Sequence, residues 1–290
     1  MYISKFKLHT ISDNLNFASD RVKDSYSTHQ FLCKYLFRDE SRRNFLFREE
    51  ENLKEREITY YIVSENKPIL NVDYPEFEIE TKIYSPAIKE GELLSFNLRA
   101  NPTISKTVEG KARSKKHDIV MNSHHVLLEN IATEININIS SKQTKSNKIN
   151  ILLTALNLHE NYKGIDKLKT IINNSPVHST MLQNKVTVSE LLYTAMEINA
   201  DNALKKWIKD KEERYGFKLI EIGNSVLLSS DRYMWNTLTK KGKNSGYNSI
   251  DYKGQLEVTN TDLFKKLLFE GVGRAKAFGC GLILIQRIRN

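Results

Sequence analysis

The most informative stretch of the chain is Glu270-Gly-Val-Gly-Arg-Ala-Lys-Ala-Phe-Gly-Cys-Gly-Leu282. It holds four of the chain's twelve glycines and two cations between them: Gly271, Gly273, Gly279, Gly281, Arg274 and Lys276. Glycine permits positive φ and a close approach of backbone to a ligand. Backbone N–H groups beside cations suit a phosphate. The stretch therefore predicts a phosphate-binding loop, and the alternative is a helix C-cap followed by a tight turn.

The residues on either side of this loop predict a helix and a strand. Apolar residues recur at helical spacing before it, at Leu263, Phe264, Leu267 and Leu268. Asn260 or Thr261 would cap that helix. After the loop, the apolar run from Leu282 to Ile288 predicts a C-terminal strand.

The composition describes a globular chain with an excess of positive charge. At 290 residues it can hold two ordinary domains. A formal charge of +9 favours polyanions, most often nucleic acid, although AT-rich genomes also raise the lysine content. Cys33 and Cys280 form no disulfide framework. Because no apolar run could span a membrane and Met1 to Leu8 lacks a signal peptide's apolar core, we expect a cytoplasmic protein without a membrane partner.

The N-terminal part of the chain predicts strands around one helix. The first strand alternates from Tyr2 to Leu8, and a helix from about Ser25 to Phe37 follows, with Asp20 or Asp24 as its cap. Three further strands are expected at Asn44–Arg48, Ile58–Val63 and Phe77–Ile83. This order matches a ferredoxin-like βαββαβ unit over residues 1–90 whose second helix is degraded.

The rest of the chain repeats that order, with an interruption. Its expected elements are a strand at Leu93–Arg99, a helix at about Ala203–Tyr215 ended by Gly216, strands at Lys218–Leu228 and Gly254–Val258, and the helix and strand around the glycine-rich loop. The fold class is therefore α+β, two tandem ferredoxin-like domains, 1–90 and 91–290. RRM-type RNA binders share this scaffold.

An insert at about 117–200 interrupts the second domain. Ser140 to Lys148 is polar and charged, and we expect it to be mobile. Thr187-Val-Ser-Glu190 predicts a capping box ahead of a helix that begins with Leu191-Leu-Tyr193. The sequence assigns this insert no role.

The predicted first helix carries a tyrosine and a histidine, Tyr26 and His29, whose side chains could take part in chemistry. They lie at i and i+3 on the predicted first helix, within Asp24-Ser-Tyr-Ser-Thr-His-Gln30, and so share one face. Histidine titrates near neutrality and can take or give a proton. His29 also heads a helical stripe with Leu32, Cys33 and Leu36, so ordinary packing in the core is the alternative.

A basic segment supplies candidates for RNA contact. Leu98-Arg-Ala-Asn-Pro-Thr103 ends a predicted strand, and Gly110-Lys-Ala-Arg-Ser-Lys-Lys-His117 follows. Its cations are Arg99, Lys111, Arg113, Lys115 and Lys116. Helical RNA presents shape and phosphates more than base edges, so a cationic strip suits it. The alternative is a solvated basic loop.

These three motifs, in this order, resemble those of the CasE family, the CRISPR RNA-processing endoribonucleases of type I-E systems. The resemblance covers about residues 1–120 and 203–290. It implies that the chain binds the repeat hairpin of CRISPR precursor RNA and cuts it at the 3′ base of the stem, with Tyr26 and His29 as catalytic residues. It also implies that the chain keeps the mature guide RNA and joins other Cascade subunits in antiviral defence.

The implied chemistry can proceed without a metal. RNA carries its own nucleophile, the 2′-OH beside the scissile phosphate, which needs alignment more than activation. His29 can move a proton, Tyr26 can position an oxygen, and Arg274 or Lys276 can offset charge on the phosphorane. The expected products are a 2′,3′-cyclic phosphate and a 5′-hydroxyl.

The other histidines predict no metal site. His9, His124, His125, His159 and His178 have no carboxylate or cysteine at ligand spacing, so we expect neither a metal nor a cofactor. Two other functions stay open. One is a non-catalytic RNA-binding subunit of a similar complex, in which Tyr26 and His29 only pack the helix. The other is an unrelated ferredoxin-like nucleic-acid binder.

Overall fold

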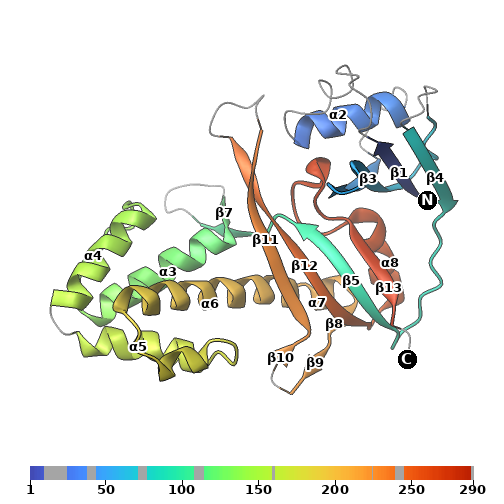
Figure 1. Cartoon of the computed structure of the whole chain (residues 1–290). Coiled ribbons are helices and arrows are strands. Elements are labelled where there is room, and N and C mark those ends of the chain that lie inside the picture. The colour runs from blue at the N-terminus through green and yellow to red at the C-terminus, as the bar shows by residue number, and fades with distance from the viewer. Residues whose placement is uncertain are drawn as a thin grey trace. The chain divides into compact units, whose positions relative to one another are not determined.

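The structure is a computed structural model that describes residues 1–9, 25–37, 44–70, 77–107, 114–158, 161–223, 225–238 and 245–288. The chain forms two compact units. Unit 1 comprises Met1–Pro102 and Lys209–Asn290, and unit 2 comprises Thr103–Ile208. Figure 1 labels the helices and strands of both units.

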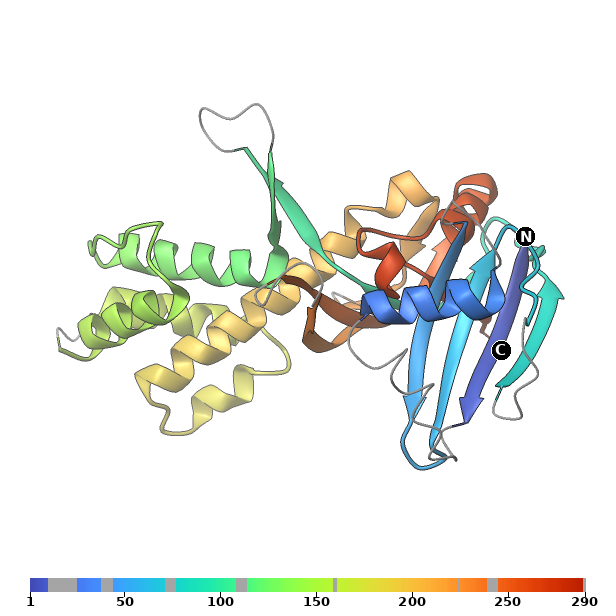
Figure 2. The same cartoon turned by 90° about the horizontal axis from the view of Figure 1, so that it is seen from above.

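Unit 1 begins with a four-stranded antiparallel sheet that carries a helix across one face (Figure 2). Its elements are β1 (Tyr2–His9), α2 (Ser25–Leu36), β2 (Phe45–Asn52), β3 (Glu57–Ser64) and β4 (Phe77–Ile83). The sheet order is β2-β3-β1-β4. Alternation along β1 sends Phe6 and Leu8 into the core, where they meet Phe31 and Leu32 of α2. The predicted first strand and first helix are confirmed, whereas Asp20 and Asp24 lie outside the described residues.

The second sheet of unit 1 repeats the order of the first. Its strands are β5 (Leu93–Ala100), β8 (Phe217–Leu219), β11 (Leu228–Thr237), β12 (Gly246–Val258) and β13 (Ile283–Arg287). β8 pairs with β12 at the side of a four-strand path, β11-β12-β5-β13. Within that path the first strand in sequence, β5, lies between the third and the fourth, as β1 does in the first sheet. Helix α8 (Thr261–Glu270) lies between β12 and β13, and its N-cap is Asn260, whose side chain accepts from the N–H of Leu263. The fold is two tandem ferredoxin-like domains, the second interrupted; the limits 1–90 and 91–290 stay a prediction.

In the second domain one predicted strand is wrong in detail and one strand was not predicted. The single strand expected at Lys218–Leu228 is divided into β8, β9 (Glu221–Ile222) and β10 (Ser225–Val226). β10 folds back on β9, and the turn between them includes Gly223 at a φ of 58°. β11, which no prediction covered, is polar and largely exposed, so it lacks the apolar alternation that marks a half-buried strand.

The helix expected at Ala203–Tyr215 begins earlier and ends earlier. α6 runs from Val188 to Lys209, and a separate short helix α7 (Glu212–Tyr215) ends at Gly216 in the left-handed conformation. The capping box explains the early start, because Thr187 and Glu190 bond to each other's backbone N–H. The predicted capping box and the predicted stop at Gly216 are therefore confirmed.

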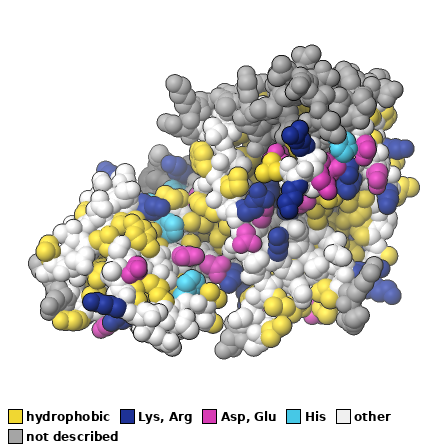
Figure 3. All heavy atoms as spheres, viewed as in Figure 1, with side chains coloured by type: hydrophobic (Ala, Val, Ile, Leu, Met, Phe, Trp, Pro, Cys, Tyr) yellow, Lys and Arg dark blue, Asp and Glu magenta, His cyan; other side chains and the backbone are white. Residues whose placement is uncertain are grey.

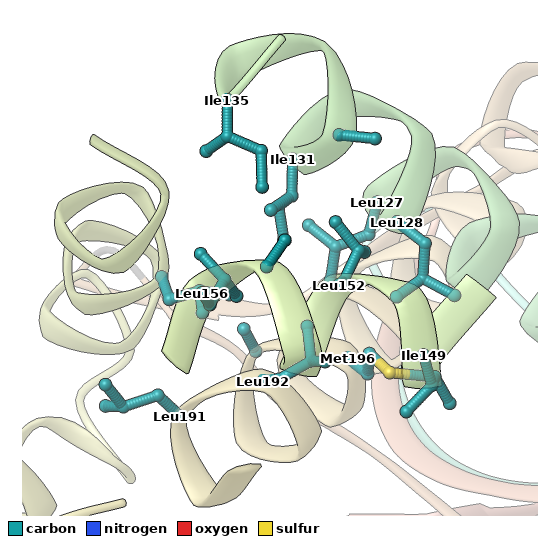
Figure 4. Close-up of a cluster of buried hydrophobic side chains, with 14 of the residues drawn as sticks. Leu127, Leu128, Ile131, Ile135, Ile149, Leu152, Leu156, Leu191, Leu192 and Met196 are labelled. Carbon is teal, nitrogen blue, oxygen red and sulfur yellow. The ribbon is translucent and has the colours of Figure 1, made fainter. Parts of the chain in front are cut away.

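Unit 2 is a helical unit with its own core (Figure 4). It contains β6 (Thr103–Lys106), β7 (Lys115–Asp118), α3 (Ile119–Glu134), α4 (Lys145–Leu158), α5 (Tyr162–Asn173), the 3-10 helix η1 (Ser179–Gln183) and α6 up to Ile208. Leu128 and Ile131 of α3, Leu152 of α4 and Leu192 of α6 are fully buried in this core. Burial of such side chains is the main force that stabilises a domain of this kind.

The expectation of a mobile segment at Ser140–Lys148 is wrong over its last four residues. Lys145 begins α4, and the Lys148 side chain is completely buried, with its ammonium ion 2.5 Å from a carboxylate oxygen of Glu129. A buried lysine needs such a partner, and the sequence does not reveal it because Glu129 lies on another helix.

Among the helices of the described segments, none has the length and apolar character needed to cross a membrane.

Candidate functional site

The glycine-rich loop joins α8 to β13 and has an unusual backbone. Its four glycines all have positive φ, from 71° at Gly271 to 92° at Gly281, and Ala275 adopts the left-handed conformation. At Gly281 a Cβ would lie 2.8 Å from the carbonyl oxygen of Val272. Between these glycines lies the 3-10 helix η3 (Lys276–Phe278). Only glycine fits a position where positive φ and a neighbouring backbone coincide.

The two ends of the loop are fastened by backbone hydrogen bonds. The N–H of Gly271 donates to Leu267, that of Val272 to Gly281, and that of Gly281 to Arg99 on β5, at 2.7–2.9 Å. Gly271 is thus the C-cap of α8, as the alternative interpretation of the loop required. These three N–H groups are used within the protein, so phosphate binding by the loop would fall to its middle, residues 273–279.

The cations of the loop lie beside a groove. Arg274 forms a backbone bridge with Asn101, and Lys276 donates through its Nζ to the carbonyl oxygen of Glu270. Burial lowers the pKa of Lys276. Both residues line a groove of about 840 Å³, together with Gly273 from the loop and Phe45 from β2. Gly279 packs at the loop's other end, where a Cβ would lie 3.2 Å from the ring of Phe47.

Tyr26 and His29 lie on α2, which contacts η3. His29 is buried, and its ring stacks on Phe45 with centroids 5.1 Å apart and planes 16° from parallel. Its Nδ1 lies 3.6 Å from the sulfur of Cys33. The half-buried Tyr26 accepts a hydrogen bond from Gln30 at 3.4 Å. Phe45 therefore connects the two motifs, because it contacts His29 and also lines the groove of Arg274 and Lys276.

A tyrosine of the second sheet links α2 to the loop. The Tyr247 hydroxyl oxygen lies 2.8 Å from Ser25 Oγ, at the first residue of α2, and 2.8 Å from the carbonyl oxygen of Phe278. Its ring also stacks on Phe278, with centroids 5.6 Å apart. Tyr247 thus joins β12 and the nearby loop to α2, which is distant in sequence.

A charged cleft of about 670 Å³ adjoins this tyrosine. Its centre is Asp251, which is buried and receives two hydrogen bonds from Arg99, at 2.7 and 2.9 Å. Arg48 and Arg232 approach the same carboxylate at 3.9 and 4.0 Å. Figure 3 shows Lys and Arg side chains interspersed with Asp and Glu over β11 and β12. The charges of this cleft are mixed, because acidic side chains also line it and the Nε of Arg48 lies 3.1 Å from a carboxylate oxygen of Glu50.

Burial and ion pairing shift the pKa values of Asp251 and of the arginines around it. Burial alone would raise the pKa of Asp251, but the hydrogen bonds and charge of Arg99, with the charges of Arg48 and Arg232, together lower it below 3.8. Burial lowers the pKa of Arg48, whose side chain is 4% exposed. Arg232, unlike Asp251 and Arg48, is exposed, with 67% of its side chain accessible. Its backbone φ is 56°, at a bulge in β11.

The remaining predicted RNA-binding residues lie elsewhere in the chain. Lys115 and Lys116 are exposed on β7 of unit 2, where Lys116 donates to Ser105. Lys111 and Arg113 fall outside the described residues. Across the described ranges, no three His, Cys, Asp or Glu side chains gather as metal ligands would.

Sequence reasoning missed Arg48, Arg232, Tyr247 and Asp251. Asp251 faces Arg99 across the β5–β12 pairing, so only the register of two strands far apart in sequence brings them together. Tyr247 lies in a part of β12 for which no strand was predicted. A correct pairing of β12 with β5 would have revealed the Asp251–Arg99 pair.

Comparison with known proteins places the chain among CRISPR proteins. The sequence model of the family described as CRISPR associated protein matches residues 1–287. The structure resembles Thermus thermophilus Cse3 bound to an RNA representing a pre-cleavage complex, with a TM-score of 0.58 and 18% identity over 98% of both chains. It also resembles the CRISPR endoribonuclease Cse3 bound to a 19-nucleotide RNA, with a TM-score of 0.56 and 18% identity over 99% of this chain and 100% of that one.

A third similar structure is the CRISPR-associated protein Cas6e from Escherichia coli K-12, with a TM-score of 0.51 and 16% identity over 99% of this chain and 100% of that one. No curated protein sequence matches the chain. At these identities the structural likenesses establish the fold, while the match over residues 1–287 establishes the family. The chain belongs to the CRISPR associated protein family, as its three motifs predicted.

Proposed function

We propose that the chain is a metal-independent endoribonuclease that binds the repeat hairpin of CRISPR precursor RNA and cleaves it at the 3′ base of the stem. One observation carries the proposal. The helix with Tyr26 and His29 packs against the glycine-rich loop, and Phe45 both stacks on His29 and lines the groove of Arg274 and Lys276. Family membership and the likeness of the fold to RNA-bound Cse3 give further support.

The proposed reaction is an internal displacement at phosphorus. The 2′-oxygen forms a bond to the scissile phosphorus, the bond to the 5′-oxygen breaks, and the products are a 2′,3′-cyclic phosphate and a 5′-hydroxyl. The 2′-OH loses a proton and the 5′-oxygen gains one, and His29 makes one of these transfers. Tyr26 orients the reacting oxygens. Arg274 or Lys276 stabilises charge on the phosphorane, where a prearranged cation is worth more than in water.

RNA binding is assigned to the cationic surfaces of both units. Lys115 and Lys116, with Lys111 and Arg113 of the same basic segment, would contact stem phosphates, and the glycines at 271, 273, 279 and 281 would shape the loop that meets the RNA backbone. Arg99 would act mainly by holding Asp251 and the pairing of β5 with β12, because its guanidinium is already bonded to Asp251. By the family resemblance, the chain keeps the mature guide RNA and joins other Cascade subunits.

The burial of His29 favours a second candidate function. A histidine that is 8% exposed and stacked on Phe45 has the surroundings of an ordinary core residue. In that case the chain would bind the repeat hairpin as a non-catalytic subunit of a CRISPR complex.

Single-turnover cleavage of a labelled repeat hairpin in EDTA distinguishes the two functions. We expect the wild type to cut, and His29→Ala to bind equally well but to cut about 10²–10⁴-fold more slowly, because proton transfer supplies a factor of that size. His9→Ala is the matched control, since His9 lies on β1 of the same unit beside Glu57 and Glu78.

A hairpin with a 2′-deoxy sugar at the cleavage position should bind and resist cleavage by the wild type. Binding without cleavage by the wild type, with or without added metal, would support the non-catalytic subunit. Cleavage that EDTA abolishes would contradict metal independence. Equal cleavage by wild type and His29→Ala would remove His29 from the mechanism.

A further inference from the structure

The Tyr247 hydroxyl has a fixed direction of hydrogen bonding. The carbonyl oxygen of Phe278 can only accept, so the Tyr247 O–H donates to it at 2.8 Å. The Ser25 Oγ, also at 2.8 Å, accepts from the same hydroxyl, so the single Tyr247 proton is shared between two acceptors. The result is a pair of hydrogen bonds that joins the first residue of α2, through β12, to the end of η3.

The surroundings of Tyr247 hold these two hydrogen bonds in place. Its ring stacks on Phe278 with planes 22° from parallel, so the ring and the hydroxyl contact the same residue of the loop. Burial raises the pKa of the Tyr247 hydroxyl well above its ordinary value of 10.0, which keeps the donated proton on the oxygen at any physiological pH. Both hydrogen bonds lie in a partly desolvated place, where a hydrogen bond is electrostatically stronger than in water.

The two hydrogen bonds of Tyr247 lie next to the residues of the proposed reaction. Ser25 directly precedes Tyr26, and the same helical turn leads to His29. Phe278 directly precedes Gly279, in the loop whose Arg274 and Lys276 line the groove. By bonding to both Ser25 and Phe278, Tyr247 therefore sets the distance between the proposed catalytic helix and the proposed phosphate-binding loop. Placement matters in such a site, since a displacement of about 1 Å can reduce a rate by about 10²-fold.

We propose that Tyr247 is a positioning residue, whose hydroxyl locks the start of α2 onto the glycine-rich loop and thereby sets the rate of RNA cleavage. This inference rests on the proposed endoribonuclease function. Tyr247 itself touches neither the RNA nor a reacting atom in this account. Its effect passes through Ser25 to Tyr26 and His29, and through Phe278 to the loop.

The test compares Tyr247→Phe with Tyr84→Phe in the full-length protein. Both changes remove one hydroxyl from a half-buried tyrosine of unit 1, and the Tyr84 ring packs edge-on against Phe269 of α8. We expect Tyr247→Phe to lower the single-turnover cleavage rate about tenfold, the scale of one lost hydrogen bond in a reacting geometry. Its dissociation constant for the uncleavable 2′-deoxy hairpin should stay within about twofold of the wild type, because the change spares every cation. Tyr84→Phe should match the wild type in both.

A double-mutant cycle with Ser25 separates positioning from general loss of structure. Ser25→Ala removes the acceptor at the α2 end of the same link, so the double variant should cut no more slowly than the slower single variant. Ser25→Thr keeps the hydroxyl and should restore the rate. Backbone hydrogen exchange over 25–30 should accelerate in Tyr247→Phe and remain unchanged in Tyr84→Phe.

The outcomes are distinguishable. If the wild type cuts and Tyr247→Phe cuts equally fast, the positioning role is overturned while the proposed function stands. Multiplicative effects of Ser25→Ala and Tyr247→Phe, or a loss of hairpin affinity equal to the loss of rate, would also overturn it. If the wild type binds the hairpin and never cuts it, the proposed function fails, and the positioning role fails with it.

Discussion

Asp251 holds one negative charge among three guanidinium groups, those of Arg48, Arg99 and Arg232. The carboxylate is almost wholly buried. Its removal leaves Arg48 with Glu50, 3.1 Å from its Nε, but takes from Arg99 both of its hydrogen bonds to a carboxylate. Taking one partner from a buried ion pair typically destabilises a protein by about 3–5 kcal/mol. We therefore expect Asp251→Ala to lower the free energy of unfolding by about that amount, measured by urea denaturation. Asp231→Ala, on the neighbouring strand but exposed, should change it by less than about 0.5 kcal/mol.

The stabilisation by Asp251 should also depend on pH, with a sign that the cluster fixes. The folded-state pKa of Asp251 lies below its ordinary value of 3.8, so the folded state favours the ionised form. The resulting stabilisation is fully present above the ordinary pKa and disappears as the pH falls through the lower folded-state pKa. The difference in unfolding free energy between wild type and Asp251→Asn should therefore be constant from pH 7 to about pH 5 and shrink below about pH 4. A difference that grows on acidification would contradict this account.

The stability of the glycine-rich loop depends on glycines at positive φ. Gly281 and Gly91 both have positive φ, but a Cβ at Gly281 would lie 2.8 Å from the Val272 carbonyl oxygen, whereas nothing lies within 4 Å of one at Gly91. We expect Gly91→Ala to cost about 1–2 kcal/mol, the conformational penalty alone. Gly281→Ala should cost about 1–3 kcal/mol more, because overpacking adds to that penalty. Thermal denaturation of the two variants measures the difference, and equal losses would show that the contact with Val272 is relieved at little cost.

The elements that the sequence predicted well are those with local signals. Helix α2 and strand β1 show apolar spacing that matches the faces they bury, and Asn260 caps α8 as expected. β11 has no such signal, because its side chains are mostly exposed and its register follows from pairing with β12. The residues of the candidate site also separate into those that the local sequence indicated and those that it did not. Tyr26 and His29 were identified because their local segment resembles that of a known family, whereas Tyr247 contacts Ser25, 222 positions away, and Phe278, 31 positions away.

At the scale of the whole molecule, the two compact units have separate cores. The core of unit 2 is drawn from α3, α4, α5 and α6, within residues 127–198. We expect Leu152→Ala, at a fully buried position of α4, to destabilise this unit by about 2–5 kcal/mol. Hydrogen exchange should then accelerate across α3 and α4 while strand β3 of unit 1 keeps its protection. Leu158→Ala on the same helix, where the side chain is 71% exposed, is the control. Faster exchange in β3 would show that the units unfold together.

The pairing of β5 has a consequence for how the chain is made. Every partner in the first sheet lies between residues 2 and 83, so that sheet can close early during synthesis on the ribosome. Leu98 of β5, by contrast, pairs with Tyr252 on one side and Ile283 on the other. The nascent chain must therefore carry β5 as an unpaired apolar strand while the whole of unit 2 is translated. An exposed strand of this kind is a target for chaperones and for aggregation, and the second sheet closes only when the last strand has been released.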